Sequence, residues 1–306
     1  MATAAVRVPA STANLGPGFD AFALALQLHN RFEAEDANEW RVQIVGEGAD
    51  HFAADDTNRV AVAMARLFVD VGEAGRCAHV RCANEVPPGQ GLGSSSAAIV
   101  GGLLLAASLA EADVPTDRLL DLATELEGHP DNAAAALLGG LTISWTDDGG
   151  PNAAALQPAG GLAVVAIPAV DPLATVTSRA LLPSHVTHRD ASFNAGRAGL
   201  LVAGLLLGEP ELTRPGLGDR LHEPYRARTI VDFAEVCNAL LLAGSTGTAL
   251  SGAGPTVVGI VQDVDDEAAF ERAQRVAEAA AISLSSLPTR LAPVALRLDR
   301  DGAQLV

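Results

Sequence analysis

The chain has 306 residues, and 37 acidic against 20 basic side chains give it a formal net charge of −17 and a pI near 4.7. Such an acidic surface disfavours nucleic acid and anionic membranes as partners. Every one of the 20 basic residues is arginine, which excludes a Schiff-base lysine and a lysine general base.

Hydrophobic residues make up 49% of the chain, enough for a sizeable core, and the length favours two domains. The cysteines Cys77, Cys82 and Cys237 form no C-x-x-C pair, as expected for a reduced compartment. Residues 1–9 lack the apolar stretch of a signal peptide, and the longest apolar runs are too short to span a bilayer. We therefore expect a cytoplasmic protein that does not associate with membranes.

The apolar periodicity predicts alternating strands and helices, and hence an α+β chain in two parts. Strands are expected at Val6–Pro9, Asn30–Ala34, Trp40–Val45, His79–Asn84, Leu141–Trp145, Leu162–Ile167, Thr256–Val261 and Val294–Leu298. Helices are expected at Thr57–Val71, Ala97–Ala110, Asp117–Glu127, Ala133–Leu138, Asn194–Leu207, Tyr225–Ala243 and Glu267–Ala280. Ala10–Asp20 is predicted to be a loop. Asp147–Gly161, rich in turn-forming residues, is predicted to join two domains, 1–158 and 159–306.

One glycine- and serine-rich segment leads directly into an apolar helical run. It consists of Pro87, Pro88, Gly89, Gln90, Gly91, Leu92, Gly93, Ser94, Ser95, Ser96 and Ala97. Glycines let the backbone approach a ligand closely, successive N–H groups form an anion nest, and the helix adds the positive end of its dipole. The segment therefore predicts a polyphosphate site. It lacks the lysine of a Walker A loop, and a flexible linker would seldom abut a strong helix.

Two further segments combine glycine with small polar residues. Pro9–Asp20 reads PASTANLGPGFD, and Ser251–Thr256 reads SGAGPT and precedes an expected strand. Glycines again permit close approach of the backbone to a ligand. Either segment alone could be only a tight turn.

Together and in this order, the three segments resemble the three motifs of the GHMP kinase superfamily. Four more stretches resemble the homoserine kinase family within it, and the likeness runs from about Val6 to Ile260. These stretches are Glu127–Asn132 (EGHPDN), Ala180–Pro183 (ALLP), Asn194–Arg197 and Glu223–Arg226 (EPYR). The resemblance implies an N-terminal domain like domain 2 of ribosomal protein S5, a ferredoxin-like C-terminal domain, and an active site in the cleft between them.

The implied reaction is ATP-dependent phosphorylation of L-homoserine to O-phospho-L-homoserine in threonine biosynthesis, and the resemblance allows a homodimer. Homoserine is a zwitterion with a terminal hydroxyl. Arg197 and Arg226 match the family's arginines, and a guanidinium binds a carboxylate through two parallel hydrogen bonds. Asp20, assisted by Asn14, suits the ammonium, and Gly252 lies in the third motif.

The resemblance places His129, Asp131 and Asn132 near the reacting hydroxyl and the γ-phosphate. Several superfamily relatives pair an aspartate with a lysine there, whereas an asparagine amide cannot accept the proton. The sequence thus favours catalysis by positioning and charge stabilisation. His129 or Asp131 as a base remains open.

A Mg²⁺ ion is expected to bridge the β- and γ-phosphates of ATP. Ser95 and Glu125 are the expected protein contacts, and Glu127 competes with Glu125. Residues two apart on a helix project to different sides, so only one of these glutamates can face the cleft.

Two alternatives remain at this level. Another GHMP kinase would act on mevalonate, shikimate or a sugar, but neither mevalonate nor shikimate offers an ammonium to Asp20. A non-catalytic sensor would be expected to lose the phosphate-loop or metal-binding residues, which this chain retains.

Overall fold

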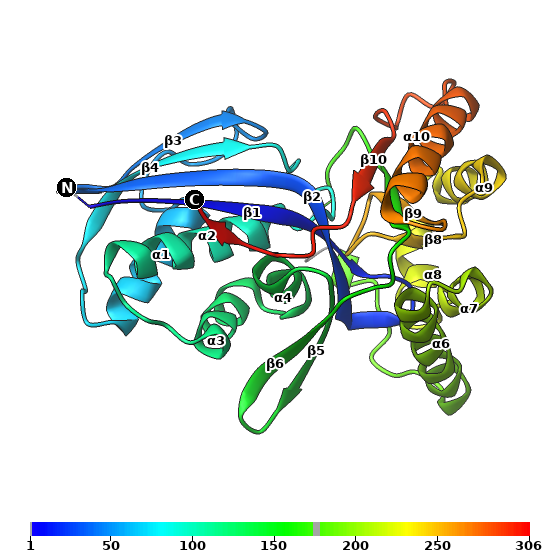
Figure 1. Ribbon diagram of the computed structural model, residues 1–306, viewed down its shortest axis with the longest axis horizontal. Helices are drawn as coiled ribbons and strands as arrows, with labels where there is room; N and C mark the ends of the chain where they lie inside the picture. Colours follow the sequence, from blue (N-terminus) through cyan, green and yellow to red (C-terminus); the bar gives the residue numbers. More distant parts are fainter. Residues whose placement is uncertain (1, 174–177) are drawn as a thin grey trace.

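The computed structural model describes residues 2–173 and 178–306, which form two β-sheets, each with its own helices (Figure 1). The two layered halves lie side by side, and the long strands β1 and β2 run from one half into the other (Figure 1). Strands and helices alternate along the chain, which confirms the α+β expectation.

The first sheet has seven strands. They are β1 (Thr3–Asn14), β2 (Gly18–Ala37), β3 (Arg41–Gly46), β4 (Cys77–Asn84), β5 (Leu141–Asp147), β6 (Gly150–Leu156) and β11 (Gln304–Leu305). The order is β11-β1-β2-β4-β3, and β5 pairs with both β2 and β6. The pairing of β3 with β4 is parallel, and the other pairs are antiparallel.

Four helices pack with this sheet: α1 (Arg59–Asp70), α2 (Ser94–Leu109), α3 (Thr116–Glu127) and α4 (Asp131–Leu138). Asn58 caps α1 by accepting a hydrogen bond from the Val60 N–H at 3.0 Å. The helix α2 is apolar on most of its circumference because it lies between α1 and the strands β1 and β2. Its position fixes the glycine loop that precedes it.

The second sheet has four antiparallel strands in the order β10-β7-β9-β8. They are β7 (Leu162–Ile167), β8 (Gly247–Leu250), β9 (Val257–Gln262) and β10 (Val294–Arg297). The helices α9 (Phe233–Ala243) and α10 (Asp266–Ser283) cover one face, and α6 (His188–Leu207) lies against the other, followed by α7 (Pro210–Gly216) and α8 (Glu223–Arg226). Every residue of β7 is buried, since Val165 contacts the α9–α10 side and Val164 the side of α6.

The expectation of a loop over Ala10–Asp20 was wrong for most of its length. β1 continues to Asn14 and β2 begins at Gly18, so only a short turn separates them. The polar residues that suggested a loop are buried in the strand, where the hydroxyls of Ser11 and Thr12 are hydrogen-bonded across to Asn132 and Ser251.

Two other expectations were partly wrong. Asp147–Gly161 contains the turn and the second strand of the β5–β6 hairpin, in which Asp147 pairs with Gly150 across a two-residue Asp-Gly turn. The helix expected over Tyr225–Ala243 is divided into α8, a 3₁₀ turn over Ala227–Thr229, and α9. The division of the chain into domains between residues 158 and 159 stays a prediction. The strand β11 lies after this boundary in the sequence but pairs with β1 of the first sheet.

Candidate active site

A cleft of about 230 Å³ gathers the motifs that the sequence singled out. Its walls come from the β1–β2 turn, the glycine loop, the α3–α4 connection, α8 and the loop after β8. The predicted residues that line it are Asn14, Asp20, Gly89, Gly91, Gly93, Ser94, Ser95, His129, Asp131, Asn132, Arg226 and Gly252. The structure therefore brings together segments that lie more than 200 positions apart in the sequence.

The glycine loop needs glycine at its two central turns. Gly91 and Gly93 have φ values of 74° and 73°, a region that L side chains seldom adopt. A Cβ on Gly91 would collide with the carbonyl of Ser251, and a Cβ on Gly93 would collide with Ser11. Gly93 is also the N-cap of α2, so the first N–H groups of this helix lie beside the cleft. This backbone can bind a polyphosphate.

A second pocket of about 220 Å³ adjoins the loop and shares Gly89, Ser94 and Ser95 with the cleft. Its other walls include apolar side chains of the first half, among them Ile44 and Phe52. An apolar pocket that continues from a phosphate loop can hold the base of a nucleotide.

The remaining loop residues hold the loop in place. Gln90 donates to the Ala169 carbonyl at 2.8 Å and accepts from the Ala169 N–H at 3.0 Å, which ties the loop to the end of β7. Leu92 and Ala97 are buried in the core, and Pro88 lines the apolar pocket.

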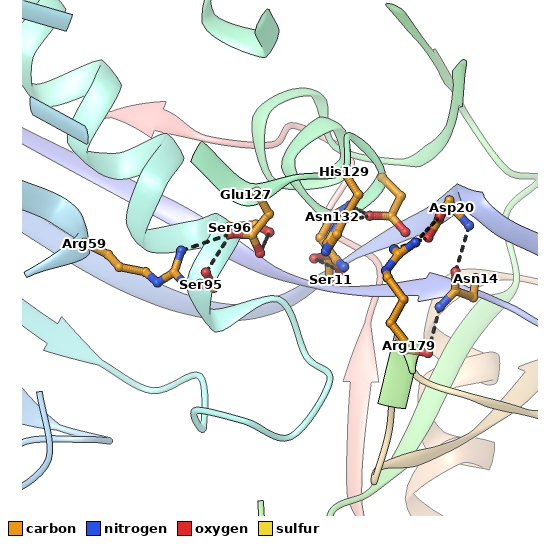
Figure 2. A network of polar contacts seen from close by, with 12 residues as sticks. Ser11, Asn14, Asp20, Arg59, Ser95, Ser96, Glu127, His129, Asn132 and Arg179 are labelled. Atoms are coloured by element: carbon orange, nitrogen blue, oxygen red, sulfur yellow. Dashed lines mark hydrogen bonds and ion pairs between the residues drawn. The ribbon is translucent and has the colours of Figure 1, made fainter. Parts of the chain in front are cut away.

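The structure places Glu127, rather than Glu125, beside the loop. Glu127 accepts hydrogen bonds from Ser95 Oγ at 2.6 Å and Ser96 Oγ at 2.9 Å, and Arg59 Nη1 lies 3.5 Å away (Figure 2). Glu125 instead pairs with Arg66 at 2.9 Å, and its side chain is 56% exposed. The expectation that Glu125 faces the cleft is corrected accordingly, because α3 turns the two glutamates to different sides.

The hydroxyl of Ser95 and the carboxylate of Glu127 are hard oxygen donors of the kind that Mg²⁺ accepts. Within residues 2–173 and 178–306, no group of three or more His, Cys, Asp or Glu side chains could hold a metal ion alone. Mg²⁺ commonly takes one or two protein ligands and completes its shell with phosphate oxygens and water, so these two residues fit a magnesium–nucleotide complex.

The EGHPDN segment presents a chain of buried polar groups at the start of α4. His129 Nδ1 lies 2.8 Å from Asp131 Oδ1, which also accepts from the Asn132 N–H at 2.7 Å. Asn132 Oδ1 accepts from Ser11 Oγ at 2.8 Å, so its amide nitrogen is the part that can donate into the cleft (Figure 2). The hydrogen bond that His129 donates to the carboxylate of Asp131 raises the pKa of His129 above its ordinary value.

Asp20 is paired with an arginine that the sequence reasoning missed. Arg179 donates from both terminal nitrogens to the two carboxylate oxygens of Asp20, each at 2.8 Å (Figure 2). The backbone of Asp20 is held by Asn14, whose Oδ1 accepts from the Asp20 N–H at 2.9 Å. Arg179 directly precedes the ALLP stretch, and this position was the signal that could have found it.

Arg226 is buried to 1% exposure with no carboxylate in salt-bridge range among the described residues. Its Nη1 donates to His222 Nδ1 and to the Gly252 carbonyl, both at 3.1 Å. Its Nε is buried without a hydrogen-bond partner in the described part of the chain. Burial lowers the pKa of this guanidinium.

Arg197 is not brought to this cleft, contrary to expectation. It lies on α6 with its guanidinium carbon 4.6 Å from the centre of the Phe193 ring, and it is absent from the described residues that line the site. Arg179 occupies the cleft instead.

Comparison with known proteins agrees with this geometry. The family models described as "GHMP kinases N terminal domain" and "GHMP kinases C terminal" match residues 58–140 and 201–281. The fold and the glycine loop thus define a two-domain GHMP kinase, as expected.

Individual relatives narrow the class. A homoserine kinase of Streptomyces coelicolor is 43% identical over 83% of this chain and 83% of its own length. Another homoserine kinase, from Carboxydothermus hydrogenoformans, is 41% identical over 84% of this chain and 85% of its own length. The crystal structure of a homoserine kinase from Cytophaga hutchinsonii superposes with a TM-score of 0.87 at 25% sequence identity. The superposition covers 99% of this chain and 97% of the other. The chain belongs to the homoserine kinase family.

In the part of the chain that the structure describes, no helix combines the length and apolarity required to cross a membrane.

Proposed function

We propose that the protein transfers the γ-phosphoryl group of ATP to the side-chain hydroxyl of L-homoserine, producing ADP and O-phospho-L-homoserine. The observation that carries this proposal is the charge arrangement beside the glycine loop. Asp20 offers an anion, and Arg179 and Arg226 offer cations, in one cleft of about 230 Å³. A small zwitterion with a hydroxyl fits this arrangement.

In the free protein, Asp20 and Arg179 satisfy each other across the cleft. A zwitterion can replace this contact, since its ammonium takes the place of Arg179 beside Asp20 and its carboxylate takes the place of Asp20 beside Arg179. Arg226 adds a buried cation to the carboxylate end. Arg226 is buried and requires a partner, whereas Asp20 and Arg179 are partly exposed. A ligand without a carboxylate would leave Arg226 unpaired, and a ligand without an ammonium would offer Asp20 nothing in exchange for Arg179.

At the other end, the N–H groups of the glycine loop and of the first turn of α2 would bind the phosphates, and the neighbouring apolar pocket would bind the adenine. Ser95 and Glu127 would hold Mg²⁺. When bound, this ion supplies charge neutralisation of the phosphoryl oxygens. Arg59, now 3.5 Å from Glu127, would be released from it.

The chain's own residues would act by positioning. The Asn132 amide would donate to the homoserine hydroxyl oxygen and direct it at the γ-phosphorus, with Ser11 holding the amide in that orientation. The oxygen–phosphorus bond forms as the bond to the bridging oxygen of ADP breaks, and the hydroxyl proton passes to the transferred phosphate. A loose phosphoryl-transfer transition state requires little help from a base.

A panel of substrate fragments tests the proposal. With Mg-ATP, release of ADP is expected to be much faster with L-homoserine than with mevalonate, shikimate or galactose. 4-Hydroxybutyrate lacks the ammonium and 3-amino-1-propanol lacks the carboxylate, and each is expected to lose at least about tenfold in kcat/KM because a hydrogen bond between charged groups is lost. Equal or better turnover of mevalonate would refute the assignment, and binding of ATP without turnover of any alcohol would favour the sensor alternative.

The biological setting extends the same proposal. O-Phosphohomoserine production places the protein in threonine biosynthesis. A cytoplasmic location and a homodimer stay predictions, for which cell fractionation and light scattering are the measurements.

A further inference from the structure

His222 is a buried histidine that none of the proposed catalytic steps uses, and it joins two parts of the substrate site. It directly precedes α8 and has no exposed surface. Its Nε2 lies 2.8 Å from the carbonyl oxygen of Gly16, in the turn between β1 and β2. Its Nδ1 lies 3.1 Å from Nη1 of Arg226.

The chemistry of these partners fixes the tautomer of His222. A carbonyl oxygen can only accept, so Nε2 carries the proton and donates to Gly16. A guanidinium can only donate, so Nδ1 presents its lone pair to Arg226. Burial lowers the pKa of His222 to about 4, in keeping with this neutral form.

The same contacts leave one edge of Arg226 for a ligand. Its Nη1 uses both hydrogens, one on His222 and one on the Gly252 carbonyl. Neither Nε nor Nη2 has a hydrogen-bond partner within the described ranges. A carboxylate binds well along such an uncommitted edge, where two parallel N–H groups meet its two oxygens.

The other end of His222 contacts a turn with unusual backbone angles. Asn14 and Leu15 at the turn and Asp20 near the start of β2 have φ values of 70°, 48° and 54°, a region that non-glycine residues seldom adopt. Phe19 stacks on the His222 ring with a centroid separation of 5.4 Å, and the guanidinium carbon of Arg226 lies 5.3 Å from the Phe19 ring. His222 could therefore serve Arg226, the turn, or both.

We infer that His222 is a positioning residue for substrate specificity: its Nδ1 lone pair fixes the rotation of the Arg226 guanidinium so that the Nε–Nη2 edge meets the substrate carboxylate. This inference rests on the proposed function. Without the Nδ1 acceptor, Nη1 would retain only the Gly252 carbonyl, and the guanidinium could rotate away from the carboxylate.

Two isosteric substitutions separate the two contacts. In His222→Asn, the side-chain oxygen can lie near the position of Nδ1 and retain the acceptor for Arg226. In His222→Gln, the amide nitrogen can lie near the position of Nε2 and retain the donor to Gly16. His29, whose Nε2 lies 2.7 Å from Asp299 outside the cleft, supplies the control variants His29→Asn and His29→Gln.

The measurement is kcat/KM for L-homoserine relative to 3-amino-1-propanol, which lacks the carboxylate, together with the KM for ATP. A general loss of structure lowers kcat/KM for both substrates alike and leaves their ratio unchanged. We expect the ratio to fall about tenfold in His222→Gln, as for loss of a hydrogen bond to a charged group. It should stay within about threefold of wild type in His222→Asn and in both His29 variants, with the KM for ATP unchanged.

The inference is overturned if His222→Gln keeps the wild-type ratio of the two kcat/KM values. It is also overturned if the ratio falls as far in His222→Asn as in His222→Gln. If His222→Asn does not fold, the ratio measured for His222→Gln decides alone. Wild-type protein that does not phosphorylate homoserine would refute the proposed function itself, which is a separate outcome from a change in ratio among active variants.

Discussion

The two ends of the cleft are built in different ways. The end that we propose binds the phosphates consists of backbone N–H groups and hydroxyls from one continuous segment, residues 87–97, joined by the side chain of Glu127. The end that we propose binds the amino acid includes three charged side chains, those of Asp20, Arg179 and Arg226, and the backbone carbonyl of Gly252, each from a separate segment.

This difference follows from the ligands. A polyphosphate has many equivalent oxygens, so a loop of glycines at a helix N-terminus can bind it without a specific side chain. A small zwitterion has two opposite charges a few ångströms apart, so the protein needs fixed charges of both signs at matching positions. On this proposal, the phosphate end tolerates a chain without lysine, whereas the amino-acid end depends on individual arginines.

The largest effect is expected where the two ends meet. Asn132→Ala should lower kcat on the order of 10²-fold, because the hydroxyl and the γ-phosphate are no longer held in line. Single-turnover kinetics with saturating ATP measure this loss. Asn152→Ala, in the β5–β6 hairpin, is the matched control and should leave kcat unchanged. Asn132→Asp should not be faster than wild type, and a faster aspartate variant would contradict catalysis without a base.

At the amino-acid end, Arg226→Ala should lower kcat/KM for homoserine roughly 10- to 100-fold, which corresponds to the loss of a hydrogen bond to a charged group. The affinity for ATP should stay the same, as measured by calorimetry. Arg226→Lys should recover only part of the loss, since an ammonium lacks the planar fork. Arg197→Ala is the matched control, and an equal loss in that variant would restore Arg197 to the site in place of its observed position beside Phe193.

At the phosphate end, Glu127→Gln should raise the Mg²⁺ concentration required for half-maximal activity about tenfold, because one charged oxygen contact is lost. Titration of the initial rate with MgCl₂ at fixed ATP measures the change. Glu125→Gln should leave the titration unaltered, since that carboxylate pairs with Arg66 on the other side of α3. If Glu125→Gln raised the required Mg²⁺ concentration and Glu127→Gln did not, Glu125 would be the metal contact.

The smallest effect concerns stability. The pKa of His129 is raised by Asp131, so the folded state binds this proton more tightly than the unfolded state. The stabilisation is complete below the ordinary histidine pKa and is lost as the pH rises through the raised value. His129→Gln should therefore lower the free energy of unfolding by about 1 kcal/mol at pH 5.5 and by less at pH 8.5. Urea denaturation at the two pH values measures the difference, and a larger loss at pH 8.5 would show that the ion pair is not the cause.

Local sequence determined much of the first half. The glycines at positions 91 and 93 and the apolar run after them specified the turns of the glycine loop and α2, because turn geometry and helix periodicity act over a few residues. Alternating apolar residues likewise indicated most strands of both sheets. The strand character of residues 10–14 was not visible, since its polar side chains find hydrogen-bond partners only across the fold.

The charged site was a different case. The sequence indicated Asp20 and Arg226, but it placed Arg197 at the site and did not indicate Arg179, and it favoured Glu125 over Glu127. Each pair consists of residues of the same type a few positions apart or in neighbouring segments, and composition and spacing do not separate such residues. Only the tertiary structure decides which of them face the cleft, because that depends on how α3 and α6 are rotated by the packing of their apolar faces against the two sheets.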